Sequence, residues 1–351
     1  MLMNDYRSPW ITPELESFRE TARRFWRTEL LPHSERWEAQ GFVDRTVWNR
    51  MGELGLLLAD LPSEYGGFDG SYAHLASLIE IGAEQGLGLG YGPHYIVAHY
   101  LNAYGSEEQK QRWLPAMASG EVVSSIGMSE PGAGSDLAGL KTRARRDGGD
   151  YVISGSKTFN TNGYHADLVL VAAKTDPAKG AKGVSLFVVD VRERRGFRRG
   201  RVLDKIGLKA QDTTELFFDE MRVPAECLLG GAEGLGFGQM MDQLPYERTL
   251  IGIRSVATAE RALALTLDHV KTREAFGAPL FKLQNTRFEL AEMKTEAALG
   301  RVFIDQCIQW QIDKRLDAAT AAMAKWWGTH KECEIIDRCL QLFGGYGFMR
   351  E

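Results

Sequence analysis

Near its middle the chain reads Leu168-Val-Leu-Val-Ala, and three similar runs lie around it: Tyr151-Val-Ile-Ser, Val184-Ser-Leu-Phe-Val-Val and Thr214-Glu-Leu-Phe-Phe. Such β-branched and aromatic runs favour strands. Glycine-containing turns separate them, and no long helical pattern lies between them. We therefore expect a β-sandwich or barrel rather than a doubly wound parallel sheet, in a domain from residue 123 to 232.

The sequence before this block predicts helices. Apolar residues recur at three- and four-residue spacing from Leu15 to Phe25, with charges between them, which is the pattern of an amphipathic helix. Thr12 followed by Pro13 is typical of a helix start. Ser106, with acidic residues after it, predicts another start. Residues 1–122 are therefore predicted to be an N-terminal helical domain.

The sequence after Gly230-Gly231 also predicts helices. Residues 237–273, 284–313 and 316–342 are long, periodic and rich in Ala, Leu and Met. Their short connections favour antiparallel neighbours in a bundle. We expect a C-terminal helical bundle at 233–351, which makes the whole chain α+β, in the order helical, β, helical.

Composition excludes several classes of protein. The chain has 351 residues, 44% hydrophobic and 25% charged, with a net charge of −5, so a general nucleic-acid binder is disfavoured. Four cysteines form no C-x-x-C pair, and the histidines are scattered, so we expect no metal site and reduced thiols. No apolar run is long enough to span a membrane, and no targeting segment is evident. We expect a cytoplasmic protein, or a mitochondrial matrix protein if a presequence has been removed.

Glycine-rich and arginine-rich stretches offer weaker alternatives. Gly86-Leu-Gly-Leu-Gly-Tyr-Gly lacks the strand before it that a dinucleotide loop needs, and is interpreted as a break between helices. Gly155-Ser-Lys-Thr lacks the remaining residues of a phosphate-binding loop. Six arginines lie between Arg192 and Arg201, and on an acidic protein a solvated loop is the favoured interpretation.

Residues 126–136 read Ile-Gly-Met-Ser-Glu-Pro-Gly-Ala-Gly-Ser-Asp. By itself this segment predicts a strand that ends in a turn rich in amides and hydroxyls. Such a turn can hold an anionic or carbonyl-rich ligand, or be purely structural. The segment alone does not decide between the two.

This segment closely resembles the first signature of the acyl-CoA dehydrogenase family. Further family-like segments follow in the family's order: Phe159-Asn-Thr-Asn-Gly, Lys205-Ile-Gly-Leu-Lys, Val223-Pro-Ala-Glu-Cys-Leu-Leu-Gly, Leu244-Pro-Tyr-Glu-Arg-Thr, Thr272-Arg-Glu-Ala-Phe-Gly-Ala-Pro-Leu and Gln341-Leu-Phe-Gly-Gly-Tyr-Gly. The resemblance covers nearly the whole chain. The family's fold, two helical domains flanking a β domain, agrees with the pattern described above.

The resemblance implies oxidation of an acyl-CoA thioester to the trans-2-enoyl-CoA with FAD. Family members place the catalytic base either on a C-terminal loop or on the helix of the Glu-Arg pair. Leu244-Pro-Tyr-Glu-Arg resembles the long-chain type, so Glu247 is the expected base, taking the α-proton while flavin N5 takes the β-hydride. Without the resemblance, Glu247 would be an ordinary helix carboxylate paired with its neighbour or with Arg254.

The resemblance also implies ligand contacts. The expected FAD contacts are Ile126, Met128, Ser129, Phe159, Thr161, Arg273, Phe276, Gln284, Gln341, Gly344 and Gly345. Ser135 and Arg248 are expected to contact the substrate. Taken singly, Arg273 could cap a helix, Gly344-Gly345 could end one, and Phe159 and Phe276 could be core residues.

Partners and alternatives follow from the same resemblance. We expect a homodimer or homotetramer in which residues near Arg273 reach a neighbouring subunit's flavin, with electron-transfer flavoprotein as the electron acceptor. The alternatives are an isovaleryl-like branched or short-chain dehydrogenase, an acyl-CoA oxidase-type flavoenzyme, and a flavin-free binding protein. Relatives continue through one more loop and helix beyond Gly344-Gly345, so we expect a truncated sequence or a further tail.

Overall fold

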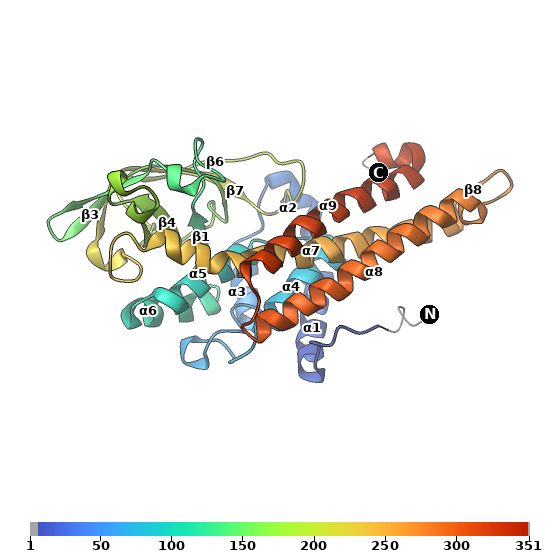
Figure 1. Cartoon of the computed structure of the whole chain (residues 1–351), viewed down its shortest axis with the longest axis horizontal. Coiled ribbons are helices and arrows are strands. Elements are labelled where there is room, and N and C mark those ends of the chain that lie inside the picture. Colours follow the sequence, from blue (N-terminus) through green and yellow to red (C-terminus); the bar gives the residue numbers. More distant parts are fainter. Residues whose placement is uncertain (1–5, 350–351) are drawn as a thin grey trace. The chain divides into compact units, whose positions relative to one another are not determined.

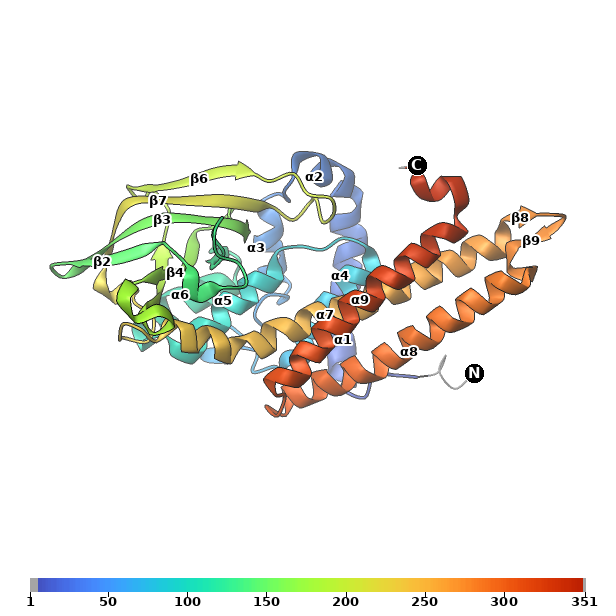
Figure 2. The same ribbon diagram turned by 45° about the horizontal axis from the view of Figure 1, so that its top comes forward.

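The computed structural model describes residues 6–349 (Figures 1 and 2). The chain forms two compact units. The first, the helical unit, contains the residues up to Arg23, Tyr72–Gly86, and the residues from Leu244 onward. The second, the β-containing unit, contains Arg24–Ser71 and Leu87–Gln243. Each unit is described separately below.

The N-terminal third is helical, as predicted. Its α-helices are α1 (Pro13–Phe25), α2 (Ser34–Gln40), α3 (Thr46–Glu53), α4 (Tyr72–Gln85), α5 (Tyr91–Tyr104) and α6 (Glu107–Ala118). The predicted helix starts are confirmed. The Thr12 hydroxyl accepts a hydrogen bond from the Leu15 amide, and Ser106 forms a capping box with Gln109. Glycines 86–90 separate α4 from α5, which confirms the predicted helix break.

A curled mixed sheet forms the core of the β-containing unit (Figure 2). Its strands are β1 (Ser124–Gly127), β2 (Arg143–Asp147), β3 (Asp150–Thr161), β4 (Leu168–Lys174), β5 (Val184–Asp190), β6 (Phe197–Val202) and β7 (Thr213–Pro224). Along the sheet the order is β1-β4-β2-β3-β7-β6, with β5 also paired to β4. β1 and β4 are parallel, whereas β3 and β7 are antiparallel.

The core of this unit lies against β4 and β5, whose side chains are almost all buried. Continuous apolar strands of this kind are covered on both faces. Tyr151 and Phe187 pack edge to face there, with ring centroids 5.0 Å apart. The four predicted runs are β3, β4, β5 and β7, so the β character of the middle domain is confirmed.

Two strands differ from expectation. Residues 143–147 and 197–202 form β2 and β6 although their sequences are rich in arginine. The expectation of a solvated loop over Arg192–Arg201 is therefore wrong for its second half, which pairs with β7 as an edge strand. Charged residues on an edge strand discourage pairing with other chains. Because arginine takes the place of apolar residues there, the strand shows no apolar periodicity from which it could be predicted.

Three long helices form the C-terminal part: α7 (Gly236–Thr272), α8 (Gln284–Ile312) and α9 (Ala318–Leu342). Their bounds agree closely with the predicted stretches, and Figures 1 and 2 show α7 and α8 joined by the hairpin of β8 (Glu274–Ala275) and β9 (Ala278–Pro279). A buried cluster that includes Leu263, Met293 and Ile335 joins the three helices. The helical, β, helical order of the chain is thus confirmed.

Candidate functional site

The end of β1 and the turn after it carry the first predicted site residues. Ile126, Met128 and Ser129 are half-buried. The Ser129 carbonyl accepts a hydrogen bond from the Thr158 amide at 2.9 Å. The Ser125 hydroxyl donates to the Thr161 carbonyl at 2.7 Å. The structure therefore brings the β1 end together with the part of β3 that contains Phe159 and Thr161.

A β-bulge displays Phe159. The pairing of β3 with β7 is interrupted between Lys157 and Asn160, and Phe159 has a φ of 58°. An aromatic residue rarely adopts this left-handed conformation, so the bulge is a strained, specific feature. It turns the Phe159 ring outward, 70% exposed, between two buried neighbours. Phe159 is not a core residue.

Thr161 and Asn162 follow the bulge. The Thr161 hydroxyl accepts a long hydrogen bond from Gln211 Nε2, at 3.4 Å. The buried Asn162 amide donates to the carbonyls of Gly90 (2.7 Å) and Ser124 (3.0 Å). A side chain on Gly90 would collide with Asn162 Oδ1, so this glycine is required by close packing. Asn162 thereby fixes the end of β3 against the start of β1.

Glu130 and Lys157 form a buried ion pair beside these residues, and sequence reasoning missed both. Lys157 Nζ lies 2.8 Å from Glu130 Oε1 and 3.1 Å from the Met128 carbonyl. The Lys157 side chain is 0% exposed and the Glu130 side chain is 6% exposed. Glu130 also accepts hydrogen bonds from the amides of Lys141 (2.6 Å) and Thr142 (2.9 Å). All three partners of the carboxylate are donors.

The pKa values of this pair reflect burial and hydrogen bonding. Burial alone would raise the pKa of Glu130, but the hydrogen bonds from Lys157, Thr142 and Lys141 outweigh it and leave that pKa below its usual value. Burial lowers the pKa of Lys157, and the Glu130 carboxylate opposes this. The sequence offers only a weak signal for the pair, because Glu130 and Lys157 are the only charged residues in the stretches 124–135 and 151–161.

Ser135 lies in the segment that leaves this turn. It is exposed, as are Pro131, Gly132 and Gly134. Paired backbone hydrogen bonds between Glu130 and Ala133 form the tight turn at the start of the segment. Ser135 thus lies in the exposed segment that follows the turn after β1.

Glu247 and Arg248 lie on α7 in the helical unit, where both are half-buried. Pro245 lies within the helix just before them, and the Thr249 hydroxyl donates to its carbonyl at 2.8 Å. The Tyr72 hydroxyl donates to the Tyr246 carbonyl at 3.2 Å, and the two rings pack at 5.0 Å. These contacts fix the turn of α7 that presents Glu247.

The predicted adenine-side residues gather at one end of the α7–α9 bundle. Phe276 and Gly277 form the two-residue turn between β8 and β9, with φ values of 55° and 77°. The Leu280 amide donates to the Arg273 carbonyl at 2.8 Å. Phe276 is 94% exposed, and Arg273 and Gln284 are also exposed. Like Phe159, Phe276 is not a core residue.

The end of α9 meets the end of α7. The rings of His269 and Phe343 stack with centroids 4.2 Å apart, and Leu342 packs against the cluster shared by the three helices. Gly344 follows with a φ of 60°, and Gln341, Gly344 and Gly345 are exposed. This contact places them at the same end as Arg273.

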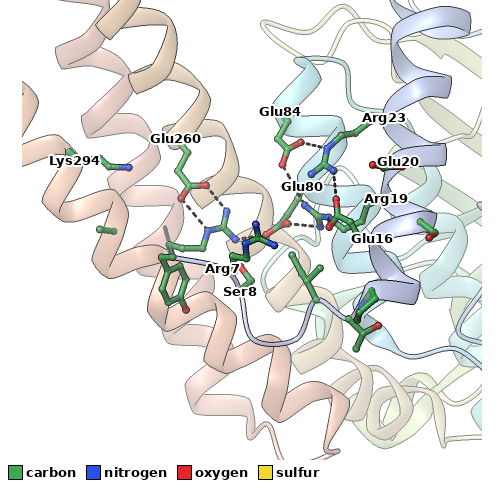
Figure 3. A pocket seen from close by; sticks show the side chains of 17 residues that line it. Arg7, Ser8, Glu16, Arg19, Glu20, Arg23, Glu80, Glu84, Glu260 and Lys294 are labelled. Atoms are coloured by element: carbon green, nitrogen blue, oxygen red, sulfur yellow. Dashed lines mark hydrogen bonds and ion pairs between the residues drawn. The ribbon is translucent and has the colours of Figure 1, made fainter. Parts of the chain in front are cut away.

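The helical unit also contains a cavity of about 840 Å³ that none of the predicted site residues lines. Figure 3 shows its charged walls, which include Arg19, Glu80 and Glu260. Arg19 pairs with Glu80 at 2.9 Å, and Arg301 pairs with Glu260 at 2.6 Å. These charges are compensated within the unit, and the cavity is distinct from the predicted site because no predicted site residue lines it.

The arginine-rich run mostly serves the fold. Arg192 pairs with Asp190 at 2.8 Å. Arg194 donates to the Asp190 carbonyl, and Arg199 donates to the carbonyls of Gly163 and Ala166. Arg198 lies over the Phe217 ring. These contacts explain the run without a nucleic-acid partner.

The described residues hold neither a metal-binding cluster nor a membrane-spanning helix. Among residues 6–349, no group of three or more His, Cys, Asp or Glu side chains is arranged to hold a metal ion. Within the same residues, no helix has both the length and the apolar character needed to cross a bilayer.

Family models define the class of this fold. Residues 12–121, 125–221 and 234–351 match the N-terminal, middle and C-terminal domains of acyl-CoA dehydrogenases. The chain belongs to the acyl-CoA dehydrogenase family, and the resemblance noted in the sequence is confirmed.

Individual relatives agree with this assignment. The chain is 42% identical to the mitochondrial long-chain specific acyl-CoA dehydrogenase of Sus scrofa over 342 residues, 96% of this chain and 79% of the relative. The structure of an acyl-CoA dehydrogenase from Geobacillus kaustophilus superposes with a TM-score of 0.95 at 44% identity, covering 97% and 90% of the two chains. The structure of a glutaryl-CoA dehydrogenase from Mycobacterium smegmatis in complex with FADH2 superposes with a TM-score of 0.89 at 29% sequence identity, and the match covers 97% of this chain and 87% of that one.

Proposed function

We propose that this chain binds FAD and dehydrogenates an acyl-CoA thioester to the trans-2-enoyl-CoA, with Glu247 as the base. Membership of the family supports acyl-CoA dehydrogenation in general. The observation that carries the cofactor proposal is the outward-turned Phe159 on its left-handed bulge, next to Thr161 and the β1 end.

The residues of the β-containing unit fit a flavin ring. Phe159 offers an exposed aromatic face in a strand whose neighbours are buried, and stacking on such a face suits a planar ligand. Ser129 and Thr161 offer hydroxyls, and Ile126 and Met128 offer half-buried apolar surface. FAD, when bound, would supply the acceptor for the β-hydride.

Glu247 would remove the α-proton of the substrate. Its half-buried position on α7 is suited to a base whose pKa rises when a bound acyl chain excludes water. Arg248, one residue on, would contact the substrate. In the β-containing unit, Ser135 on its exposed turn would contact the CoA arm.

The exposed residues at the end of the bundle support assembly. Arg273, Phe276, Gln284, Gln341, Gly344 and Gly345 would hold the adenine half of a flavin bound to a neighbouring subunit. Phe276 and Phe348 are 94% and 91% exposed, and exposed aromatic side chains of this size favour an interface. A homodimer or homotetramer is therefore part of the proposal.

Three further expectations from the sequence remain part of the proposal. The domain limits are 1–122, 123–232 and 233–351. Electron-transfer flavoprotein is the electron acceptor, and the protein has a cytoplasmic or matrix location.

Substitution of Glu247 by Gln tests the base. We expect a yellow protein with normal FAD content and a kcat/KM lowered roughly 10²- to 10⁴-fold, because general base catalysis contributes that much. Asp268→Asn, an exposed carboxylate on the same helix, is the matched control and should retain wild-type turnover. Turnover within a factor of about three of wild type in Glu247→Gln would overturn the assignment.

Three simple measurements separate the alternatives. A colourless protein that takes up no FAD would identify a flavin-free binding protein. Rapid reoxidation of the reduced protein by air would identify the oxidase alternative. Anaerobic bleaching with acyl-CoAs of graded length and branching would distinguish a long-chain from an isovaleryl-like substrate.

A further inference from the structure

The carboxylate of Glu130 closes the neck of the exposed segment 131–140. Glu130 stands at the start of this segment, and its side chain reaches the amides of Lys141 (2.6 Å) and Thr142 (2.9 Å) at the other end. Hydrogen bonds from both residues to one buried carboxylate hold the two ends of the segment together. Ser135 lies within the enclosed segment.

Within the segment, Ala133 and Leu140 are buried and restrain it further, whereas its glycines lie in the open. Added Cβ atoms at Gly132 and Gly134 would meet nothing within 4 Å, so neither residue is packed. Within the segment, Asp136 caps a short turn by accepting a hydrogen bond from the Gly139 amide at 3.2 Å. That contact shapes the tip of the segment, whereas Glu130 fixes its two ends.

Lys157 connects this neck to the end of β1. Its ammonium donates to Glu130 Oε1 at 2.8 Å and to the Met128 carbonyl at 3.1 Å. Its stem lies against Gly127, where an added Cβ would be 3.2 Å from Lys157 Cγ. The side chain thus packs against the last residue of β1 and donates to the carbonyl of the residue that follows it.

Stability alone does not account for such a pair. Removing two charges from water offsets most of their attraction, and buried ion pairs are often replaceable by apolar residues. Hydrogen bonds of fixed direction, in contrast, determine where each backbone segment lies. Three of the four contacts made by this pair go to backbone groups, and the fourth joins its two charges.

We infer that Glu130 and Lys157 are a positioning pair, which fixes the Met128–Ser129 turn after β1 and the Ser135 segment as one rigid element and so sets flavin and CoA binding together. This inference rests on the proposed function for the roles of Met128, Ser129 and Ser135. The preorganisation itself belongs to the chain and exists before any ligand binds.

Hydrogen exchange on flavin-free protein tests the preorganisation. In Glu130→Gln, the amides of Lys141 and Thr142 should exchange about tenfold faster or more, because their acceptor is weakened. The amides of residues 168–173 in β4 should exchange at the wild-type rate; Lys174 is left out of this comparison because its amide donates to the Thr142 carbonyl. Asp147→Asn, which weakens the exposed pair with Arg222 in the same sheet, is the control and should leave residues 141 and 142 unchanged. Wild-type exchange at these two amides in Glu130→Gln would overturn the inference.

Ligand affinities test the coupling. Glu130→Gln and Lys157→Met should each weaken FAD binding and raise the KM for acyl-CoA about tenfold. In the double variant, which removes the unpaired charge, the two effects should be less than additive because one element is lost. A merely structural role predicts instead that affinity falls only as global stability falls. Unfolding midpoints measured on the same variants decide between these results.

The two proposals fail separately. If the wild-type protein takes up no FAD, the proposed function fails, while exchange at residues 141 and 142 still decides whether the pair closes the segment. If FAD binds and Glu130→Gln changes neither affinity, the positioning role fails and the proposed function stands.

Discussion

The two units of the molecule each contain a buried ion-pair network, and the networks are built differently. In the β-containing unit, Lys157 and Glu130 turn toward backbone groups on either side of an exposed segment. In the helical unit, Arg19, Arg301 and Glu80 pair with other side chains across α1, α4 and α8, beside a cavity (Figure 3).

This difference indicates what each network can do. Hydrogen bonds to backbone fix the course of a loop, whereas pairs between side chains join helices. The helical network is also less completely satisfied. Arg19 Nε and Asp305 Oδ2 are buried without hydrogen-bond partners among the described residues, and such atoms cost free energy. The helical network should therefore be the more sensitive to loss of a single carboxylate.

Substitution of Glu80 by Ala should have the largest effect on stability. Glu80 is 3% exposed and accepts from both Arg19 and Arg301, so its loss leaves two buried guanidinium groups short of a partner. We expect the free energy of unfolding to fall by about 3–5 kcal/mol, measured by urea unfolding. Glu84→Ala is the control. Its side chain is 37% exposed, and its loss should cost no more than about 1 kcal/mol. Equal costs for the two variants would contradict the comparison.

Acid should affect the β-containing unit through His94. This buried ring accepts a hydrogen bond from the Ser124 amide at 3.2 Å and contacts the Met117 carbonyl at 3.1 Å, so it joins α5, α6 and β1. Burial lowers the pKa of His94 from 6.5 to about 4. Between these values the unfolded chain binds a proton that the folded chain does not.

The contribution of neutral His94 is therefore complete above pH 6.5 and disappears as the pH falls toward 4. We expect a loss of up to about 3 kcal/mol across this window, from the size of the pKa shift. Stability measured between pH 7 and 4 tests this. His94→Gln should be less stable at pH 7 but should show a shallower acid dependence. His33→Gln, at an exposed position, should follow the wild-type curve.

Much of the fold could be predicted because its signals are local. The apolar runs of β4 and β5 and the long periodic stretches of α7 to α9 are strong patterns. β2 and β6 could not be found in this way, since their sequences, Arg-Ala-Arg-Arg-Asp and Phe-Arg-Arg-Gly-Arg-Val, carry no apolar alternation. They become strands because neighbouring strands supply hydrogen bonds, which is a tertiary effect.

The site was only partly predictable for a related reason. Met128, Ser129 and Phe159 belong to short segments that resemble a family, so the sequence predicts them as site residues. The outward turn of Phe159 depends on a left-handed φ that an aromatic residue rarely adopts, and its sequence gives no sign of it. The Glu130–Lys157 pair joins residues that only strand pairing brings together, and no periodicity reports such a contact.

Substitution of Trp10 by Phe should have an intermediate effect. Trp10 Nε1 donates to Asp305 Oδ1 at 2.9 Å in a buried setting. Phe keeps one aromatic ring but removes the donor and the five-membered part of the indole, so a carboxylate that already has one unsatisfied oxygen loses a partner. We expect a cost of about 1–3 kcal/mol, measured by urea unfolding. Trp326→Phe, at a 69% exposed position, is the matched control. A similar cost for both would show that the hydrogen bond to Asp305 contributes little to stability.

The smallest effect should come from an exposed network of the same chemistry. Arg222 pairs with Asp150 at 3.0 Å and also with Asp147, and all three side chains are exposed. In water these charges are screened and remain solvated when separated. Asp150→Asn should therefore shift the melting temperature by less than about 2 °C, with no further change when salt is raised. A shift as large as that of Glu80→Ala would mean that burial is not what makes the helical network important. The comparison between the two buried networks would then have to rest on geometry alone.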